Sequence, residues 1–452
     1  MDTFDVIVIG LGPGGEHVAG TLAERGLRVL GIDHGLVGGE CPYWGCIPSK
    51  MVVRAAEVLA EARRVEGLAG AVGEVRPDWS VVARRIREEA TDDWNDQVAV
   101  ERLTKKGASF VRGTGRIVGP GRVDVDGRPY AAERGIVVNA GSSAAIPPID
   151  GLEEAGYWTN HELIEATELP ASLVVLGGGA IGCELGQAVA RFGVEVTIVE
   201  AGDGLLGGEE PEAGSAVREA LEHDGVTLHL GREATRVSRG PEGVEVRLDD
   251  GTSVHGGRLL VATGRRTDPA AVGLGTVGVP SDARFAPIDA RCRVADGVWA
   301  IGDLTGKGAF THVSMYQAGI VIRDLLDEDG PTADYTALPR VTFTDPEAGA
   351  VGLTEAQARE SGVEVAVGST PIQGTTRGWI HDSGTAGVIK VVADADRGVL
   401  VGATVVGPFG GEIVGALAVA VHAQVPVERL RSMIYAYPTF HRGIEEALGA
   451  LR

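Results

Sequence analysis

The chain has 452 residues, 41 Lys and Arg against 63 Asp and Glu, a formal net charge of -22, and 44% hydrophobic residues. Its length predicts about three domains, and the acidic balance argues against nucleic acid and acidic membranes as partners. An apolar run follows Asp2 and Asp5 without a basic leader, and no stretch is long enough to span a bilayer. We therefore expect a cytoplasmic protein without a membrane segment.

The first predicted element is a short strand that ends in a glycine-rich turn. Residues 6–9 are apolar and β-branched, and Gly10, Gly12 and Gly15 follow with G-x-G-x-x-G spacing before a helical stretch. In such a turn the first glycine permits the bend, the second lets the backbone approach a pyrophosphate, and the third lets helix and strand pack closely. Asp33 ends the next strand, where a carboxylate can bind ribose hydroxyls. These features predict a dinucleotide-binding unit.

Two of the four cysteines, Cys41 and Cys46, lie close together in the segment GGECPYWGCIPSK. Zinc sites usually pair cysteines as C-x2-C with further ligands nearby, whereas Cys183 and Cys292 are far along the chain. A static disulfide is unusual in a reducing compartment. We therefore favour a redox-active pair at the start of a helix, where the dipole stabilises a thiolate, and we predict no metal site.

The glycine pattern then recurs after a second strand. Gly177, Gly179 and Gly182 follow residues 173–176, and Glu200 closes the next strand. Two such units imply two dinucleotides. Glu200 can bond a free 2′-hydroxyl and would repel a 2′-phosphate, so the pattern favours NADH over NADPH.

These units and four further segments resemble the flavin-dependent pyridine nucleotide-disulfide oxidoreductases, the family of dihydrolipoamide dehydrogenase, glutathione reductase and mercuric reductase. The resemblance covers essentially the whole chain; the segments are VVNAGSSAAIPPIDG, LLVATGRRTD, GVWAIGDLTG and VTFTDPEAGAVGLTEAQA. It implies an α/β fold with two Rossmann-like domains, for FAD and NAD(P)H, and an α+β carboxy-terminal dimerisation domain. We expect the FAD domain at 1–150 and 278–332, the NAD(P)H domain at 151–277 and the dimerisation domain at 333–452.

The last domain also has elements that its own sequence predicts. Apolar residues at 387–394 and 400–407 are typical of strands, and an apolar helix is expected at 412–423.

The resemblance also implies roles for individual residues. Cys46 corresponds to the sulfur next to the flavin, Cys41 to the sulfur that attacks the substrate, and Lys50 to the lysine near the flavin ring, with Glu184 as its ion-pair partner. Independently of the family, a cation beside a flavin stabilises the anionic reduced ring, and a buried carboxylate keeps that cation charged. Further cofactor contacts are implied at Asp303, Thr114, Ser142 and Gly264.

The carboxy-terminal segment departs from the family pattern. Where the family has His-Pro-Thr-x-x-Glu, Tyr437 takes the place of the histidine and Arg442 that of the glutamate. A phenol titrates near ~10 and is a poor base at neutral pH. Three interpretations stay open. His441 could act as the base, with Glu445 on the same face of a helix that begins near residue 439. Tyr437 could act as a hydrogen-bond donor in a site whose electron acceptor needs little proton transfer, such as a quinone, a metal ion or a dye. Tyr437 could also simply pack.

Residues 37–50, which contain both cysteines and which we call the redox segment, depart from the family pattern as well. Glu40 stands where the family commonly has threonine, and Tyr43 and Trp44 follow the first cysteine. Two bulky aromatic residues would narrow the approach to the sulfurs, stack a flat substrate or cover the flavin. Soluble transhydrogenases resemble this chain in the tryptophan and in a Tyr-Pro-Thr tail, but they lack the second cysteine, which Cys46 supplies here.

We predict an FAD-dependent oxidoreductase that passes a hydride from NADH via FAD to the Cys41/Cys46 disulfide and on to a disulfide or other small acceptor. Two alternatives stay open: direct transfer from flavin to a quinone or second nicotinamide, and a redox-sensing flavoprotein without turnover. The resemblance implies a homodimer with shared active sites, so Tyr437 and His441 would serve the disulfide of the other subunit.

Overall fold

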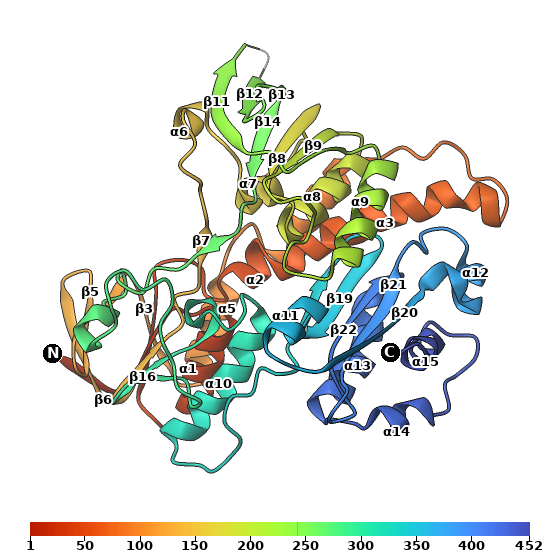
Figure 1. Cartoon of the computed structure of the whole chain (residues 1–452). Helices are drawn as coiled ribbons and strands as arrows, with labels where there is room; N and C mark the ends of the chain where they lie inside the picture. The colour runs from red at the N-terminus through yellow and green to blue at the C-terminus, as the bar shows by residue number, and fades with distance from the viewer. Residues whose placement is uncertain (242) are drawn as a thin grey trace. The chain divides into compact units, whose positions relative to one another are not determined.

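The computed structural model describes residues 1–241 and 243–452, which divide into two compact units (Figure 1). The first unit comprises Met1–Ser49, Arg84–Ala145 and Arg265–Asp334, and the second comprises Lys50–Ala83, Ile146–Gly264 and Tyr335–Arg452. Among the described residues, no helix combines the length and apolar character that crossing a membrane requires.

An eight-stranded sheet forms the centre of the first unit. Its main path runs β16-β17-β6-β1-β2-β3, and β4 and β5 extend from β6. The pairs among β17, β6, β1, β2 and β3 are parallel. The strands are β1 Asp2–Ile9, β2 Val29–Asp33, β3 Ser109–Arg112, β4 Gly115–Gly119, β5 Arg122–Val125, β6 Arg128–Val138, β16 Arg293–Ala295 and β17 Val298–Ala300; a separate pair joins β7 Ser143–Ala144 to β15 Arg265–Arg266.

Both faces of this sheet are buried where its core strands pair, which explains why the second half of β1, Val6–Ile9, reads as a continuous apolar run. Val6 and Val8 belong to one core cluster and Ile7 and Ile9 to another, so alternate side chains fill opposite faces. Helices α1 and α10 pack against each other. The helices of this unit are α1 Pro13–Glu24, α2 Glu40–Tyr43, α5 Gln97–Lys105 and α10 Thr311–Leu325, with a π-helical segment at Ile86–Ala90 and 3-10 turns at Leu274–Val277 and Gly302–Thr305.

Two helices contain residues of both units. The 23-residue helix α3, Cys46–Leu68, begins with Cys46 of the first unit and then belongs to the second, and α4, Trp79–Arg85, ends where the first unit resumes.

The second unit contains a second parallel sheet, in the order β10-β9-β8-β14. Its strands are β8 Ser172–Leu176, β9 Glu195–Glu200, β10 Thr227–Leu230 and β14 Arg258–Val261, and an antiparallel sheet is formed by β11 Ala234–Gly240, β12 Gly243–Leu248 and β13 Ser253–Gly256. The helices here are α6 Leu152–Ala155, α7 Asn160–Glu165, α8 Ala180–Arg191 and α9 Pro211–His223.

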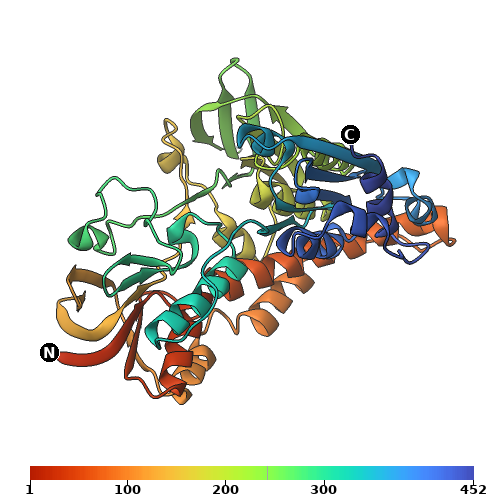
Figure 2. The same ribbon diagram turned by 60° about the horizontal axis from the view of Figure 1, so that its bottom comes forward.

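A five-stranded antiparallel sheet, β18-β19-β22-β21-β20, completes this unit, and α13 packs against β19 and β22 (Figure 2). The expected strands and helix appear as β21 Val388–Asp394, β22 Val399–Gly407 and α13 Gly410–His422. The remaining elements are β18 Pro339–Thr342, β19 Glu347–Gly352, β20 Val365–Pro371, α11 Glu355–Glu360, a 3-10 turn Ile372–Gly374, α12 Thr376–His381, α14 Val427–Arg431 and α15 Arg442–Gly449.

A buried lysine connects the five-stranded sheet to helices α9 and α11 within the second unit. Lys390 of β21 has a side chain only 6% exposed, and its ammonium lies 2.9 Å from both Glu210 and Glu212 and 3.1 Å from Glu355. Hydrogen bonds to these carboxylates raise its pKa against the opposing effect of burial, which is the largest single influence. The lysine is therefore held as a cation, and it ties the start of α9 to β21 of the five-stranded sheet.

Candidate functional site

A tight turn brings the two close cysteines together. Cys41 lies in α2 and Cys46 begins α3. The backbone N–H groups of Trp44 and Gly45 both donate to the Glu40 carbonyl, at 2.9 and 2.7 Å. A Cβ on Gly45 would lie 3.3 Å from the Cys41 Cα, so the chain folds back closely on Cys41 at this point. The geometry suits two sulfurs that form and break a bond with each other.

The surroundings of Cys41 affect its acidity. Its hydrogen bond with Cys46, followed by burial, raises the pKa of the Cys41 thiol, and a hydrogen bond with Thr311 acts in the opposite direction. The Thr311 hydroxyl also lies 3.3 Å from the Cys46 sulfur. In the single chain Cys46 is exposed and Cys41 half-buried, and both are free cysteines. Thr311 was not found by sequence reasoning because 265 residues separate it from Cys46.

Lys50 and Glu184 form an ion pair. Lys50 lies one turn after Cys46 in α3, and its ammonium is 2.6 Å from one Glu184 oxygen and 4.6 Å from the centroid of the Phe343 ring. The second Glu184 oxygen accepts a hydrogen bond from the Phe343 N–H at 2.8 Å. Because the Glu184 side chain is only 6% exposed, removing Lys50 would leave a buried charge without its counter-ion.

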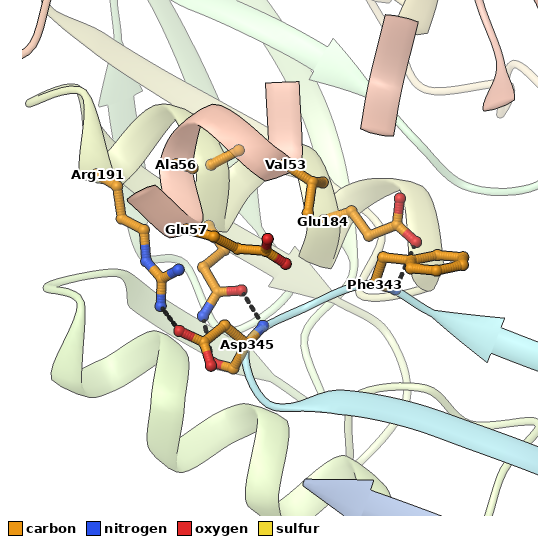
Figure 3. A pocket seen from close by; sticks show the side chains of 9 residues that line it. Val53, Ala56, Glu57, Glu184, Arg191, Phe343 and Asp345 are labelled. Carbon is orange, nitrogen blue, oxygen red and sulfur yellow. Dashed lines mark hydrogen bonds and ion pairs between the residues drawn. The ribbon is translucent and has the colours of Figure 1, made fainter. Parts of the chain in front are cut away.

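A small pocket lies behind Glu184, with walls from α3, α8 and the turn before β19 (Figure 3). Arg191 pairs with Asp345 at 2.8 Å, and the Gln187 amide both donates to the Asp345 carbonyl and accepts from its N–H. Burial raises the pKa of Glu57, which lines the same pocket. Arg191 and Gln187 both bond Asp345 and so fix the turn that follows Phe343, whose N–H binds Glu184. We therefore interpret these residues as structural support for Glu184 and not as a substrate site.

In the first glycine-rich turn, the chain's own backbone requires glycine at two of the three positions. Gly10 has φ 89°, and a Cβ there would lie 2.3 Å from the Asn139 carbonyl oxygen. A Cβ on Gly15 would lie 2.0 Å from the Gly10 carbonyl oxygen. Gly12, by contrast, has an ordinary extended conformation and would bring a Cβ only to 3.1 Å from the Asn139 side chain.

The second glycine-rich turn repeats this geometry. Gly177 has φ 108° and would bring a Cβ to 2.4 Å from the Ala262 carbonyl oxygen, and Gly182 to 2.0 Å from that of Gly177. Gly179 has an ordinary φ of −79°, and no described atom lies within 4 Å of a Cβ built on it. Packing therefore does not require a glycine at 179, but a pyrophosphate at this helix amino terminus would. The residues fit a dinucleotide.

The acidic residues that end β2 and β9 accept hydrogen bonds from the glycine-rich turns. Asp33 accepts hydrogen bonds from the N–H groups of Leu11 and Gly35, at 2.6 and 2.8 Å. Glu200 accepts one from Gly178 at 2.5 Å in the second unit. Each carboxylate therefore shapes its turn, and ribose binding by Asp33 and Glu200 stays a prediction.

A polar chain connects the redox segment to two predicted cofactor residues. Glu40 lies 3.6 Å from Arg265, whose guanidinium donates to the hydroxyl and carbonyl of Ser142. The Ser142 hydroxyl bonds in turn to Asp303. Sequence reasoning did not identify Arg265, which lies far along the chain from Glu40. Its guanidinium provides a contact for Glu40, the residue that departs from the family pattern.

The other two predicted cofactor residues lie in loops. Thr114 is exposed just before β4, and its N–H donates to Asp126 at 3.2 Å. Gly264 has φ 113° and open space where a side chain would be. Their contribution to a cofactor site stays a prediction.

The tail does not form the expected pair of His441 and Glu445. Helix α15 begins at Arg442 rather than near residue 439, so exposed His441 precedes the helix. Glu445 lies 2.9 Å from the Arg442 guanidinium, and among the described residues no ion pair joins it to His441. Tyr437 is 66% exposed, with its hydroxyl 3.4 Å from that of Thr376. The pair expected on one helix face is therefore absent within the single chain.

One aromatic residue of the redox segment also differs from expectation. Tyr43 is only 6% exposed, and its hydroxyl donates to the Val37 carbonyl at 3.3 Å. It cannot narrow an approach from solvent, whereas Trp44 is partly exposed.

Comparison with known proteins places this geometry in a family. Residues 4–318 match the family described as "Pyridine nucleotide-disulphide oxidoreductase", and residues 338–448 match the dimerisation domain of that family. A dihydrolipoyl dehydrogenase from Thermus scotoductus is 33% identical, with 100% of this chain and 98% of the relative covered. A mercuric reductase from Lysinibacillus sphaericus is 30% identical over 99% of this chain and 82% of its own length.

Solved structures agree. The Cu(II) complex of the HOCl-induced flavoprotein disulfide reductase RclA from Escherichia coli superposes with a TM-score of 0.86 at 27% identity, covering 99% of each chain. LpdA from Mycobacterium tuberculosis gives a TM-score of 0.86 at 26% identity, also over 99% of each chain. These matches confirm the expected fold class and the family resemblance. The chain therefore belongs to the pyridine nucleotide-disulphide oxidoreductase family, as a flavin-dependent NAD(P)H disulfide oxidoreductase.

Proposed function

We propose that this enzyme takes electrons from NADH and delivers them through the Cys41–Cys46 pair to a small acceptor. Bound FAD would supply the two-electron carrier between the nicotinamide and the disulfide. With a disulfide as acceptor, NADH and one proton become NAD⁺ while the acceptor becomes two thiols. The observation that carries the proposal is the turn that folds Gly45 against Cys41 and places the two sulfurs together at the start of α3.

We assign the flavin-side sulfur to Cys46 and the acceptor-side sulfur to Cys41. The amino terminus of a 23-residue helix favours negative charge at Cys46. The raised pKa of Cys41 suits a thiol that donates a hydrogen bond to its neighbour. Lys50, kept charged by Glu184, would be the cation beside the flavin ring. The family resemblance gives the two sulfurs the same roles.

The tail bears on the class of acceptor. A disulfide acceptor calls for a base that moves protons to and from Cys41, yet Tyr437 stands in the histidine position and Glu445 is engaged by Arg442. A metal ion takes up electrons without protons: two Cu(II) ions could each take one electron as the dithiol becomes a disulfide, and the two thiol protons would go to solvent rather than to the acceptor. Metal ions are thus a second candidate class, and the mercuric reductases and the Cu(II) complex of RclA among the relatives are consistent with it.

Electrostatics near Glu200 support NADH. Besides Gly178, the Gly202 N–H donates to this carboxylate at 2.7 Å. Arg232 donates its N–H to the Glu200 carbonyl at 3.0 Å, but its guanidinium lies 2.9 Å from an Asp250 oxygen. A 2′-phosphate would therefore meet one carboxylate and an arginine that is already paired.

We also propose a homodimer whose interface is formed by residues 333–452. In each subunit, residues 1–150 and 278–332 would bind FAD, and residues 151–277 would bind the nicotinamide. The carboxy-terminal segment exposes apolar side chains of the kind that subunit interfaces cover. They are Trp379, Ile380, Phe409, Val419, Met433, Ile434 and Tyr437.

An anaerobic NADH titration of the purified flavoprotein tests the proposal. A long-wavelength absorbance band after two electrons, from a thiolate beside the oxidised flavin, is expected in the wild type and should be lost in Cys41→Ser with Cys46→Ser. Dithiol-dependent reduction of disulfides or Cu(II) should disappear in the same variant. Reduction of quinones that survives there, without a band in the wild type, would instead favour direct transfer from the flavin. Negligible NADH oxidation with disulfides, Cu(II) and quinones would favour a sensor without turnover.

A further inference from the structure

Three consecutive non-glycine residues adopt the left-handed backbone conformation. Asp92, Asp93 and Trp94 have φ 47°, 55° and 56°, and they follow the π-helical segment Ile86–Ala90 almost directly. Non-glycine residues rarely adopt this conformation, and it persists only where surrounding contacts enforce it. π-Helical turns are likewise rare and are frequent at functional sites.

Local contacts hold this turn in place. The hydroxyl of Thr91, a residue only 1% exposed, donates to the Ile86 and Arg87 carbonyls at 3.1 and 3.2 Å. Arg87 pairs with Asp93 at 2.6 Å and lies 5.2 Å from the centroid of the Trp94 ring. Arg87 therefore contacts the indole and also holds the residue that precedes it.

The turn directs two side chains onto the segment that carries the redox pair. The indole N–H of Trp94 donates to the Tyr43 carbonyl at 3.3 Å. The Asp96 carboxylate, 9% exposed as a residue, accepts the Val37 N–H at 2.7 Å and the Arg112 guanidinium at 2.6 Å. Residues 91–96, which we call the clamp, thus hold the redox segment on both sides of Cys41.

The redox segment also contacts the first glycine-rich turn. The Gly38 N–H donates to the Leu11 carbonyl at 2.7 Å, and a Cβ on Gly39 would lie 2.9 Å from the Gly12 Cα. The segment is therefore held by backbone contacts with that turn as well as by the hydrogen bonds of the clamp.

We propose that Trp94 and Asp96 are positioning residues for the redox pair, and that the left-handed turn is retained because it aims both at the redox segment. By holding the Tyr43 carbonyl and the Val37 N–H, they restrict the segment that presents Cys41 to Cys46. Restricting two thiols to proximity favours the disulfide over the dithiol. This inference rests on the proposed function, since it gives the pair its place in the electron path.

Thiol exchange tests the clamp without using NADH. The full-length flavoprotein is equilibrated with mixtures of reduced and oxidised dithiothreitol, quenched with acid and alkylated, and the dithiol fraction of the Cys41–Cys46 peptide is measured by mass spectrometry. In this exchange the protein disulfide gains two electrons and two protons as dithiothreitol becomes its cyclic disulfide. Trp94→Phe keeps a ring beside Arg87 and removes the N–H. We expect a shift toward the dithiol of about fivefold, or about 20 mV for a two-electron couple.

Trp79→Phe is the matched control. Trp79 is 7% exposed, and its indole N–H donates to the Ala166 carbonyl at 2.8 Å, a bond of the same kind away from the redox segment. It should lower the melting temperature about as much as Trp94→Phe without changing the exchange equilibrium. Asp96→Asn, which weakens the other contact of the clamp, should shift the equilibrium in the same direction and serves if Trp94→Phe does not fold.

An unchanged equilibrium in Trp94→Phe, or an equal shift in Trp79→Phe, would overturn the inference. If Trp94→Phe does not fold, an unchanged equilibrium in Asp96→Asn would overturn it as well. The proposed function fails independently, if the wild-type pair exchanges with dithiothreitol but takes no electrons from NADH.

Discussion

The two glycine-rich turns have the same backbone but different surroundings. In both, the third glycine would bring a Cβ to 2.0 Å from the carbonyl oxygen of the first. The first turn is also covered by α10, because a Cβ on Gly14 would lie 2.1 Å from the Ser314 hydroxyl and 2.8 Å from its carbonyl oxygen. The matching position of the second turn is partly exposed Ile181. The comparison shows that the third glycine is required by the backbone in both turns, that Gly14 is required only by its neighbour Ser314, and that packing does not require Gly179, where we predict a role in binding the nucleotide.

The largest effect is expected where the two turns agree. Gly15→Ala and Gly182→Ala each force a methyl group onto a backbone oxygen that cannot move away without opening the turn. Each should cost about 3 kcal/mol of unfolding free energy or prevent folding. Urea unfolding of both variants measures this, and a stable Gly182→Ala protein would break the claimed equivalence.

The next effect should appear in the first turn alone. Gly14→Ala meets Ser314 and should destabilise by about 2 kcal/mol. Ile181→Ala, at the corresponding position, should cost less than about 1 kcal/mol, since this side chain is only partly buried. Equal losses in the two variants would show that α10 does not constrain the first turn.

The middle glycines should separate ligand binding from stability. Gly179→Ala meets no described atom within 4 Å, so unfolding should change by no more than about 0.5 kcal/mol. The KM for NADH should nevertheless rise at least about tenfold, because the methyl group occupies the approach of the pyrophosphate. Gly12→Ala should lower FAD retention and also cost some stability through the Asn139 side chain. An unchanged KM in Gly179→Ala would remove the main support for nucleotide binding at this turn.

A smaller effect is expected for nicotinamide choice. Asp250→Asn should release Arg232 toward the region of Glu200 and raise kcat/KM for NADPH relative to NADH by about threefold. Steady-state kinetics with both nucleotides measures the ratio, and Arg232→Ala in the same background should abolish the gain. No change in the ratio would mean that Arg232 does not reach the 2′ position.

The smallest effect concerns Cys183, whose thiol bonds to the Gly178 carbonyl beneath the second turn at 3.3 Å. Burial raises its pKa, so the folded protein keeps it protonated at a pH where a free thiol, near ~8.5, has begun to ionise. We expect no alkylation of Cys183 by iodoacetamide at pH 8–9 in the folded, reduced protein, while exposed Cys46 reacts. Stability should then fall as pH rises above the unfolded-state pKa, because unfolding releases this proton. Rapid modification of Cys183 in folded protein would contradict its assigned environment.

Short-range pattern was enough to predict much of the fold and of the candidate site. Both strand–glycine turn–helix units, the close cysteine pair, and the strands and helix of the last domain could be predicted, because each depends on spacing within about thirty residues. The family resemblance added Lys50 and Glu184, whose ion pair the structure forms across 134 residues. The pairing of His441 with Glu445 failed, because spacing shows which residues share a helix face but not where the helix begins or that Arg442 takes the carboxylate.

By itself, the sequence determined the α/β class, the two dinucleotide units and the redox character of Cys41 and Cys46, since glycine spacing and cysteine context act through local backbone geometry. Only the tertiary structure decided which distant groups surround that pair: Thr311 beside the sulfurs, Arg265 against Glu40, and Trp94 and Asp96 around the redox segment. These contacts join residues far apart in the chain, and a hydrogen bond between them depends on how the sheet and its loops bring the backbone together. For the same reason, the sequence did not show that Tyr43 is buried rather than placed where it could narrow the approach to the sulfurs.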